Sequence, residues 1–564
     1  MSLEKIKHIY QKLIIKKSIL IIFCVIVFFL SLGVKSLPLI KKQQVIVNDH
    51  IQLVLARNMA WGLGYKIEAK DGLILSSSLI AKQAMAAPNP YWGTSLIYSW
   101  LFKFFGFSGN LLLPIIVSLL THAMITVLFF ILIKRLFGYS VAAIFVFFEI
   151  FLPALIHSSL MVEFYEFASL FFTFGLIFYF FRKELPSRFN LFCTGLFFTL
   201  AILCRNAFLF SYGAFVIYEF YKNRSFKRVL CFILPGIILV ILALTYALPR
   251  NYSMGFIGGM VGEVTPSFQF YGHVFPDPYT FNYDQEGFFQ SGRRLANYVE
   301  PSLAFGRHYS LGNYLSIWTR LLTSYFFGFF DLLIWGGPLI MLLLVFGFIY
   351  LWKEKRKIFE LFVLWLGIWF FSFAILARTD NWTHYLELEF LVVLAVSVGL
   401  FWLLKILLES NLFKKITKYL IIFVVFVFLG SFLMQANRWM LHEAYSGDMQ
   451  QTIEDLAHYL NTKNLTDKDV IAVSISQRMP YALNYFTDLN YVYFDPSTLE
   501  RLVSENRLKE AFSKYGVNKI LGYTPELSEK VIKSTGAENL ASHIHIQEEK
   551  NVIIYPDKTL ENSL

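Results

Sequence analysis

Residues 18–34 read SILIIFCVIVFFLSLGV, an uncharged apolar run that decides the class of fold. The segment before it carries five lysines: Lys5, Lys7, Lys12, Lys16 and Lys17. A cleaved signal peptide would end in a small-residue cleavage site, which is absent here. The run therefore predicts a retained membrane helix. Its basic flank places the N-terminus in the cytoplasm, because lysine and arginine resist translocation.

Further apolar segments of similar length follow the first one. They lie at residues 111–133, 140–156, 163–181, 190–203, 207–220, 229–248, 330–351, 359–377, 390–407 and 419–434. A helix needs about 20 apolar residues to cross a bilayer. Only 16% of the 564 residues are charged, compared with roughly 25% in soluble domains. The sequence predicts an α-helical polytopic membrane protein with about 11 transmembrane helices.

Basic residues between these segments indicate the orientation in the cytoplasmic (inner) membrane. They fall in alternate loops, which the positive-inside rule makes cytoplasmic: Lys134, Arg135, Arg182, Lys183, Arg188, Lys222, Arg224, Lys227, Arg228, Lys353, Lys355, Arg356, Lys357, Lys414, Lys415 and Lys418. The net charge of +11 is thus an orientation signal, and we expect no nucleic-acid partner. An odd number of spans places the C-terminus outside.

Most of the remaining sequence is then external. It comprises the loops 35–110 and 249–329 of a transmembrane domain (residues 1–435) and a soluble C-terminal region (residues 436–564). That region alternates predicted strands (470–475, 491–494, 519–522, 543–546, 552–555) with predicted helices (449–460, 480–486, 497–515, 525–533), which favours an extracytoplasmic α/β domain. Without a phosphate-binding glycine motif, it is typical of a lid, an acceptor-binding module or a structural module.

The cysteines predict neither a disulfide framework nor a cysteine zinc site. No CxxC pair occurs, and all of them lie in or beside apolar segments: Cys24, Cys193, Cys204 and Cys231.

Charged residues at the outer ends of the predicted spans are the candidate site residues. They are Asp49, Glu163, Glu166, Arg205, Arg378, Asp380 and His384. Charges next to membrane spans are costly and by default functional. The external loops bring these acids and bases to one depth, which suits a lipid-phosphate substrate. Arginine or histidine would bind the phosphate, and a carboxylate would take the proton of an attacking hydroxyl.

Each of these residues also has a structural interpretation. Asp49 suits the N-cap of a helix that starts near Ile51, an interpretation of equal weight. Glu163 and Glu166 fit structural ion pairs, Arg205 an anchor between two short spans, and His384 an interfacial histidine without a ligand. Glu149 differs, because it lies inside an apolar run and must face the bundle interior, paired with another group.

Residues 49–65, DHIQLVLARNMAWGLGY, resemble the first external loop of the GT-C fold glycosyltransferases. These polytopic enzymes include protein mannosyltransferases, lipid A aminoarabinose transferases and arabinofuranosyltransferases. The matching elements are Ala56-Arg57-Asn58 and Gly62-Leu63-Gly64, and the turn at Trp92-Gly93 is similar too.

Further matches follow in order over roughly residues 1–435. Residues 159–165, SLMVEFY, are similar to the small-x-Glu entry into the family's fourth span. Leu203-Cys204-Arg205-Asn206 resembles its Leu-Thr-Arg-Pro-Glu turn, and His384-Tyr385 resembles the Arg-Tyr that opens a late span. The chain also departs from the pattern. The family's acidic pair aligns on or just before Asn48, so that Asp49 is shifted, and histidine replaces arginine at His384, where phosphate contact becomes pH-dependent.

The resemblance implies a function. A sugar, hexosyl or pentosyl, would pass with inversion from a polyprenyl-phosphate donor to a glycan, glycolipid or protein acceptor at the outer face of the lipid bilayer. Asp49 would be the general base. Arg205, Arg378 and His384 would hold the donor phosphate, and the remaining residues would bind substrate: Glu163, Glu166, Asn48, His50 and Asp380. The resemblance leaves the metal requirement open, since some relatives use a divalent metal and others do not.

Two other functions fit the same sequence. A transporter or flippase for a lipid-linked saccharide predicts charges at the bilayer midplane and broken helices there, for which Glu149 is suitably placed. A non-catalytic membrane scaffold predicts that Asp49 is dispensable.

Overall fold

The computed structural model of the protein describes residues 3–40, 51–62, 68–69, 72–73, 92–107, 109, 111–160, 165–180, 188–205, 207–247, 338–376, 382–409, 448–466, 468–473, 479–487, 489–494, 496–541, 543–546 and 552–555. A few helical positions between 419 and 434 are described as well.

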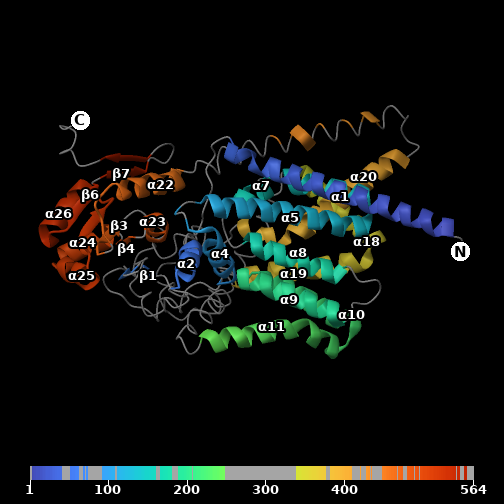
Figure 1. The fold of residues 1–564 in the computed structure, drawn as a ribbon, viewed down its shortest axis with the longest axis horizontal. Coiled ribbons are helices and arrows are strands. Elements are labelled where there is room, and N and C mark those ends of the chain that lie inside the picture. Colours follow the sequence, from blue (N-terminus) through green and yellow to red (C-terminus); the bar gives the residue numbers. More distant parts are fainter. Residues whose placement is uncertain are drawn as a thin grey trace, which may run out of the picture.

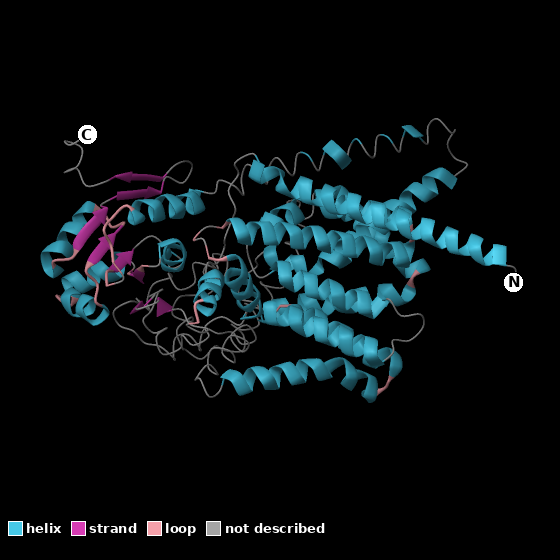
Figure 2. Cartoon of the chain, viewed as in Figure 1, coloured by secondary structure: helices cyan, strands magenta, loops and turns pink. Residues whose placement is uncertain are grey.

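Most of the described chain forms a bundle of helices (Figures 1 and 2). They are α1 (Leu3–Ile40), α5 (Leu112–Phe137), α6 (Tyr139–Phe151), α7 (Pro153–Leu160), α8 (Tyr165–Phe180), α9 (Arg188–Cys204), α10 (Phe208–Asn223), α11 (Phe226–Ala247), α18 (Pro338–Glu354), α19 (Arg356–Leu376) and α20 (Glu389–Glu409). A 3-10 helix of seven residues, η3 (Trp382–Leu388), leads into α20.

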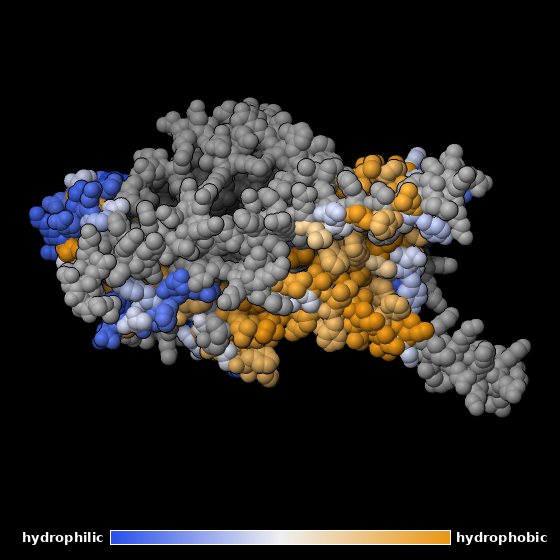
Figure 3. All heavy atoms as spheres, turned by 90° about the horizontal axis from the view of Figure 1, so that it is seen from above, coloured by the Kyte–Doolittle hydropathy of each residue, from blue (hydrophilic) through white to orange (hydrophobic). Residues whose placement is uncertain are grey.

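The bundle has the properties of a helical membrane protein. Among the described residues, three helical segments are long and apolar enough to cross a membrane: Ser18–Leu37, Leu112–Phe137 and Tyr385–Glu409. Shorter apolar helices accompany them: Tyr139–Phe151, Tyr165–Phe180 and Arg188–Cys204. Figure 3 shows apolar residues covering the visible, described surface of the bundle. The count of about 11 spans and their orientation stay predictions.

Two predicted boundaries are wrong. The predicted span 140–156 is two helices, because α6 ends at Phe151 and Pro153 starts α7 after the extended Leu152; proline lacks an N–H and is tolerated at a helix start. The predicted loop 35–110 begins too early, since α1 continues through Lys35 to Ile40.

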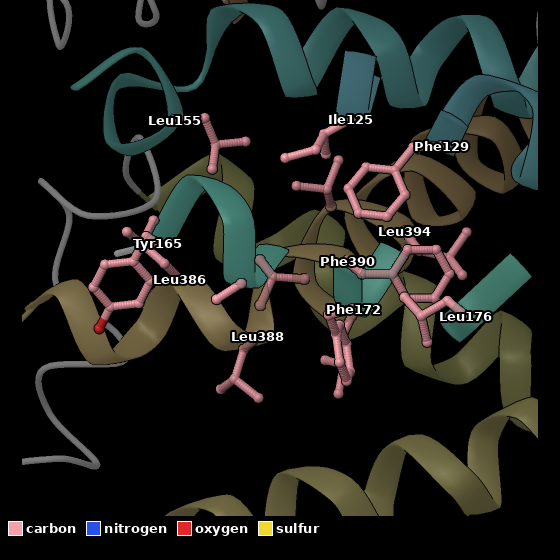
Figure 4. Packing of buried hydrophobic residues seen from close by; sticks show 14 of the residues in the cluster. Ile125, Phe129, Leu155, Tyr165, Phe172, Leu176, Leu386, Leu388, Phe390 and Leu394 are labelled. Atoms are coloured by element: carbon pink, nitrogen blue, oxygen red, sulfur yellow. The ribbon is translucent and has the colours of Figure 1, made fainter. Parts of the chain in front are cut away.

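Helix α20 forms the centre of the bundle. Its residues from Phe390 to Leu400 are buried on every side, as expected for a helix that is apolar all round. The Phe390 ring lies 5.3 Å from that of Phe129 on α5, and Figure 4 shows both within the packed core. On its other side α20 meets α18 closely, because a Cβ on Gly347 would overlap the carbonyl of Ala395.

Two further helices lie between the bundle and the C-terminal region, α2 (Ile51–Ala60) and α4 (Trp92–Phe105) (Figure 1). They pack on each other, and α4 also packs on α9. A short antiparallel pair, β1 (Glu68–Ala69) and β2 (Gly72–Leu73), follows α2. We call the end of the bundle next to α2 and α4 the loop end.

The C-terminal region contains a parallel sheet with the strand order β4-β3-β5-β6. Its elements are α22 (Asp448–Asn461), β3 (Val470–Val473), α23 (Met479–Thr487), β4 (Asn490–Tyr493), α24 (Pro496–Ser504), α25 (Leu508–Tyr515), β5 (Lys519–Leu521), α26 (Pro525–Thr535) and β6 (Glu538–Ala541). An antiparallel pair, β7 (His543–Ile546) and β8 (Val552–Tyr555), follows. We call this assembly the α/β unit.

Helices cover both faces of the parallel sheet, as strand alternation requires. Ile471 and Val473 pack against α22 and α23. Ala472, between them in sequence, packs on the opposite face with α24, α25 and α26. The domain boundary at 435/436 and the external location of the α/β unit stay predictions.

Candidate active site

The structure describes only part of the predicted site. Several predicted site residues lie outside the described residues: Asn48, Asp49, His50, Glu163, Arg378 and Asp380. The backbone of His384 belongs to η3, but its side chain is also outside the described part. Glu166 and Arg205 are described, and the structure brings both to the loop end.

Glu166 lies in the first turn of α8, where the helix dipole favours a negative charge. Its side chain is buried, and its Oε1 accepts a hydrogen bond of 2.7 Å from the Tyr98 hydroxyl on α4. This bond ties the start of α8 to α4 and fixes the direction of the carboxylate.

Arg205 directly follows α9, and its backbone N–H donates to Ala201 at 2.8 Å. The residue is 6% exposed. Its guanidinium carbon lies 4.4 Å from the ring centroid of Tyr165, the residue before Glu166. A cation over an aromatic face is attracted by the ring quadrupole. Tyr165 therefore brings the predicted phosphate-binding arginine and the predicted substrate-binding carboxylate to one corner.

The start of α4 closes this corner because it carries a glycine. A Cβ on Gly93 would come within 2.9 Å of the backbone carbonyl of Leu203. Only glycine lets α4 approach the end of α9 this closely. The next residue, Thr94, is fully buried.

Helix α2 is attached to the same corner. The Ser95 hydroxyl on α4 donates to the Gln52 side-chain carbonyl near the start of α2. Gln52 follows Asp49 by three positions in the sequence. The chain that follows the predicted base, Asp49, therefore leads directly to this corner.

A second group of polar side chains lies inside the bundle. The ammonium of Lys35 on α1 donates to Glu149 on α6 at 3.4 Å, and neither side chain is exposed. The Glu149 carboxyl also interacts with that of Glu389, at the start of α20. The expectation that Glu149 is paired within the bundle is confirmed. Glu389 is the first residue of α20 and is 5% exposed, so that it belongs to the interior of the bundle.

Several residues of these two groups escaped the sequence analysis. Tyr98 lies in an aromatic segment that suits a membrane-interface belt. Nothing in the neighbouring sequence therefore predicts its hydrogen bond to Glu166. Gln52 is likewise inconspicuous. Lys35 ends an apolar run, which is where lysine normally reaches the membrane surface.

The described residues give no metal site. No group of three or more histidine, cysteine, aspartate and glutamate side chains in that part of the chain is arranged to hold a metal ion.

Comparisons with known proteins give distant structural likenesses. No family model matches the sequence, and no curated protein matches it. The structure is similar to that of ArnT from Cupriavidus metallidurans bound to undecaprenyl phosphate, with a TM-score of 0.46 and 11% identity over 93% of this chain and 89% of that chain. It is also similar to the archaeal oligosaccharyltransferase AglB from Archaeoglobus fulgidus in complex with an inhibitory peptide and a dolichol-phosphate. There the TM-score is 0.49 and the identity 9%, over 88% of this chain and 69% of that chain.

Proposed function

We propose that the protein is a membrane glycosyltransferase of the GT-C class. It moves a sugar from a polyprenyl-phosphate donor to a glycolipid, polysaccharide or protein acceptor at the outer face of the cytoplasmic membrane. The observation that carries the proposal is the placement of Arg205 and Glu166. The family resemblance predicts both as site residues. Arg205 lies over the ring of Tyr165, and Glu166, the next residue of α8, accepts a hydrogen bond from Tyr98 at the loop end.

Arg205 is suited to hold the donor phosphate. A guanidinium offers a planar fork of N–H donors that matches phosphate oxygens. The Tyr165 ring, 4.4 Å from the Arg205 guanidinium carbon, attracts the cation at this position. Arg378 and His384 are the further phosphate-binding residues of the proposal.

Glu166 is suited to orient the sugar or the acceptor hydroxyl, since Tyr98 holds one of its oxygens. Asp49 takes the proton of the attacking hydroxyl. The acceptor oxygen forms a bond with the anomeric carbon, and the bond from that carbon to the phosphate oxygen breaks. Attack from the opposite face inverts the anomeric carbon, and polyprenyl phosphate leaves with the electron pair.

The test is a transfer assay with purified protein in vesicles, supplied with a panel of polyprenyl-phosphate sugars and an envelope extract as acceptor source. We expect release of polyprenyl phosphate with one of the donors. Arg205→Ala should weaken donor binding more than Arg205→Lys does, because both charge and fork geometry contribute. Arg356→Ala is the control, as its side chain is 57% exposed at the start of α19. Equal donor affinity for Arg205→Ala and the unmodified protein removes Arg205 from the site.

A second candidate function is a flippase for a lipid-linked saccharide. It draws on the charges of Lys35, Glu149 and Glu389 inside the bundle. The same vesicles separate the two functions, because a flippase moves the labelled lipid between leaflets with its sugar–phosphate bond intact.

A further inference from the structure

Arg57, in the Ala-Arg-Asn segment of α2, joins the bundle side of the molecule to the α/β unit. Its Nη1 donates to the backbone carbonyl of Asn484 at 2.7 Å, and its Nη2 donates to the Asn484 Oδ1 at 2.6 Å. These two residues are 427 positions apart in the sequence. Both side chains are fully buried. The Arg57 side chain of α2 therefore binds Asn484 of α23 through both of its terminal nitrogens.

The orientation of this contact is fixed from both sides. On the α2 side, Nε and Nη2 of Arg57 each donate to the Asn58 Oδ1 at 3.2 Å. On the α23 side, the Asn484 Nδ2 donates to the carbonyl of Leu489 at 2.6 Å. The Asn484 amide can therefore present only its oxygen to Arg57. A buried cation held by several hydrogen bonds is sensitive to the loss of any one of its partners.

Aromatic side chains extend the contact to Glu166. The guanidinium carbon of Arg57 lies 4.6 Å from the Trp61 ring centroid. Tyr485, next to Asn484, has its ring centroid 5.2 Å from that of Phe107, and Phe107 is 5.3 Å from Phe102. Phe102 in turn stacks on Tyr98, at 6.1 Å. Because Tyr98 donates to Glu166, a continuous line of packed side chains runs from the α/β unit to the candidate site.

We propose that the α/β unit is a positioning module of the active site and that Arg57 is the positioning residue through which it acts. The α/β unit holds α2 through the contact between Asn484 and Arg57. It thereby fixes the helix that follows Asn48-Asp49-His50 and positions the base relative to the donor. This inference rests on the proposed function. It assigns no chemistry to the α/β unit and no substrate contact to Arg57.

Two variants interrupt the contact at its two ends. Arg57→Lys keeps the charge and loses the fork, while Asn484→Leu removes the Oδ1 acceptor at similar volume. Each should lower kcat by about 10- to 100-fold, since a displacement of about 1 Å in a site can reduce the rate by that much, and each should leave donor affinity unchanged. The double variant should be no slower than the slower single variant, because both changes break one interaction.

The docking itself is measured by hydrogen exchange of the amides in residues 51–62. Asn484→Leu should accelerate exchange there and leave exchange in α22 unchanged. Asn461→Leu, at the exposed end of α22, and Arg356→Lys are the matched controls, and both should behave as the unmodified protein.

Three results overturn the inference. Unchanged exchange in residues 51–62 of Asn484→Leu shows that the α/β unit does not hold α2. Accelerated exchange with unchanged kcat shows that the contact is structural only, and a parallel loss of donor affinity shows that Arg57 binds substrate. If the unmodified protein transfers no sugar, the proposed function fails, and the exchange measurement still decides whether the docking exists.

Discussion

Lys35 carries a charge to a position where none of its side chain is exposed. Such a charge is tolerated only with a partner, because removing a cation from water costs several kcal/mol. Glu149 is that partner, 114 residues away. The pair joins α1 to α6, because Lys35 lies on the first helix and Glu149 on the second.

Breaking this pair from one side should be more damaging than removing it. Lys35→Met leaves two buried carboxyls without their cation, and we expect a loss of about 3–5 kcal/mol in unfolding free energy. Adding Glu149→Gln to the same protein should recover much of that loss. Unfolding curves of both variants, measured in one detergent, give these changes in free energy. An unchanged unfolding free energy in Lys35→Met would show that the pair does not form.

Some residues of the loop end and of the bundle interior could be predicted from the sequence, and others could not. The sequence predicts Arg205 and Glu166 as site residues, because a charge beside an apolar segment is conspicuous and their motifs occur in order; the structure describes both at the loop end, and their roles stay predictions. Tyr98 and Lys35 were not predicted, because each has an ordinary local explanation at the membrane surface. Their roles depend on partners 68 and 114 residues away, which no local pattern contains.

At the scale of elements, the contact between α4 and α9 places the corner that holds Arg205. This contact depends on Gly93, because a Cβ there would clash with the backbone of Leu203. Backbone atoms cannot move aside as the end of a flexible side chain can. Overpacking of this kind typically costs 1–3 kcal/mol.

Gly93→Ala should therefore displace α4 and reduce both stability and sugar transfer. Gly367→Ala is the matched control, because nothing lies within 4 Å of a Cβ at that position in α19. There we expect unchanged transfer and equal or higher stability, since alanine favours a helix over glycine. Gly93→Ala with normal transfer would show that the corner tolerates a wider spacing.

Element type was easier to predict than element ends. The predicted strands 470–475, 491–494 and 519–522 correspond to β3, β4 and β5 of the parallel sheet. The predicted helix 497–515 is wrong: α24 ends at Ser504 and α25 begins at Leu508, with Asn506 at φ +58° between them. Asparagine tolerates this left-handed conformation. The strand β6 was missed because it pairs only along one edge and alternates weakly.

At the scale of the whole molecule, basic turns gather at the end of the bundle opposite the loop end. Tyr218, near the end of α10, donates to the Lys357 carbonyl at 2.8 Å. Lys222 pairs with Glu360 of α19. The turns α10–α11 and α18–α19 thus lie side by side, and the positive-inside rule predicts a cytoplasmic location for both.

This arrangement predicts the topology. A tag inserted at Lys355 should be accessible only from the cytoplasm, and a tag at the C-terminus only from outside. Labelling of intact and permeabilised cells with an impermeant reagent distinguishes them. A C-terminal tag that is protected in intact cells would place the α/β unit in the cytoplasm and remove the outer-face site.

In the proposed function, Asp49 is the base of a sugar transfer from a lipid phosphate. The most direct measurement compares transfer and donor binding in Asp49→Asn and the unmodified protein. Asparagine caps a helix about as well as aspartate, but it cannot accept the proton. We expect donor binding to be retained and transfer to fall by roughly 10²–10⁴-fold, with recovery when Asn48→Asp is added. Full transfer by Asp49→Asn alone would contradict the account.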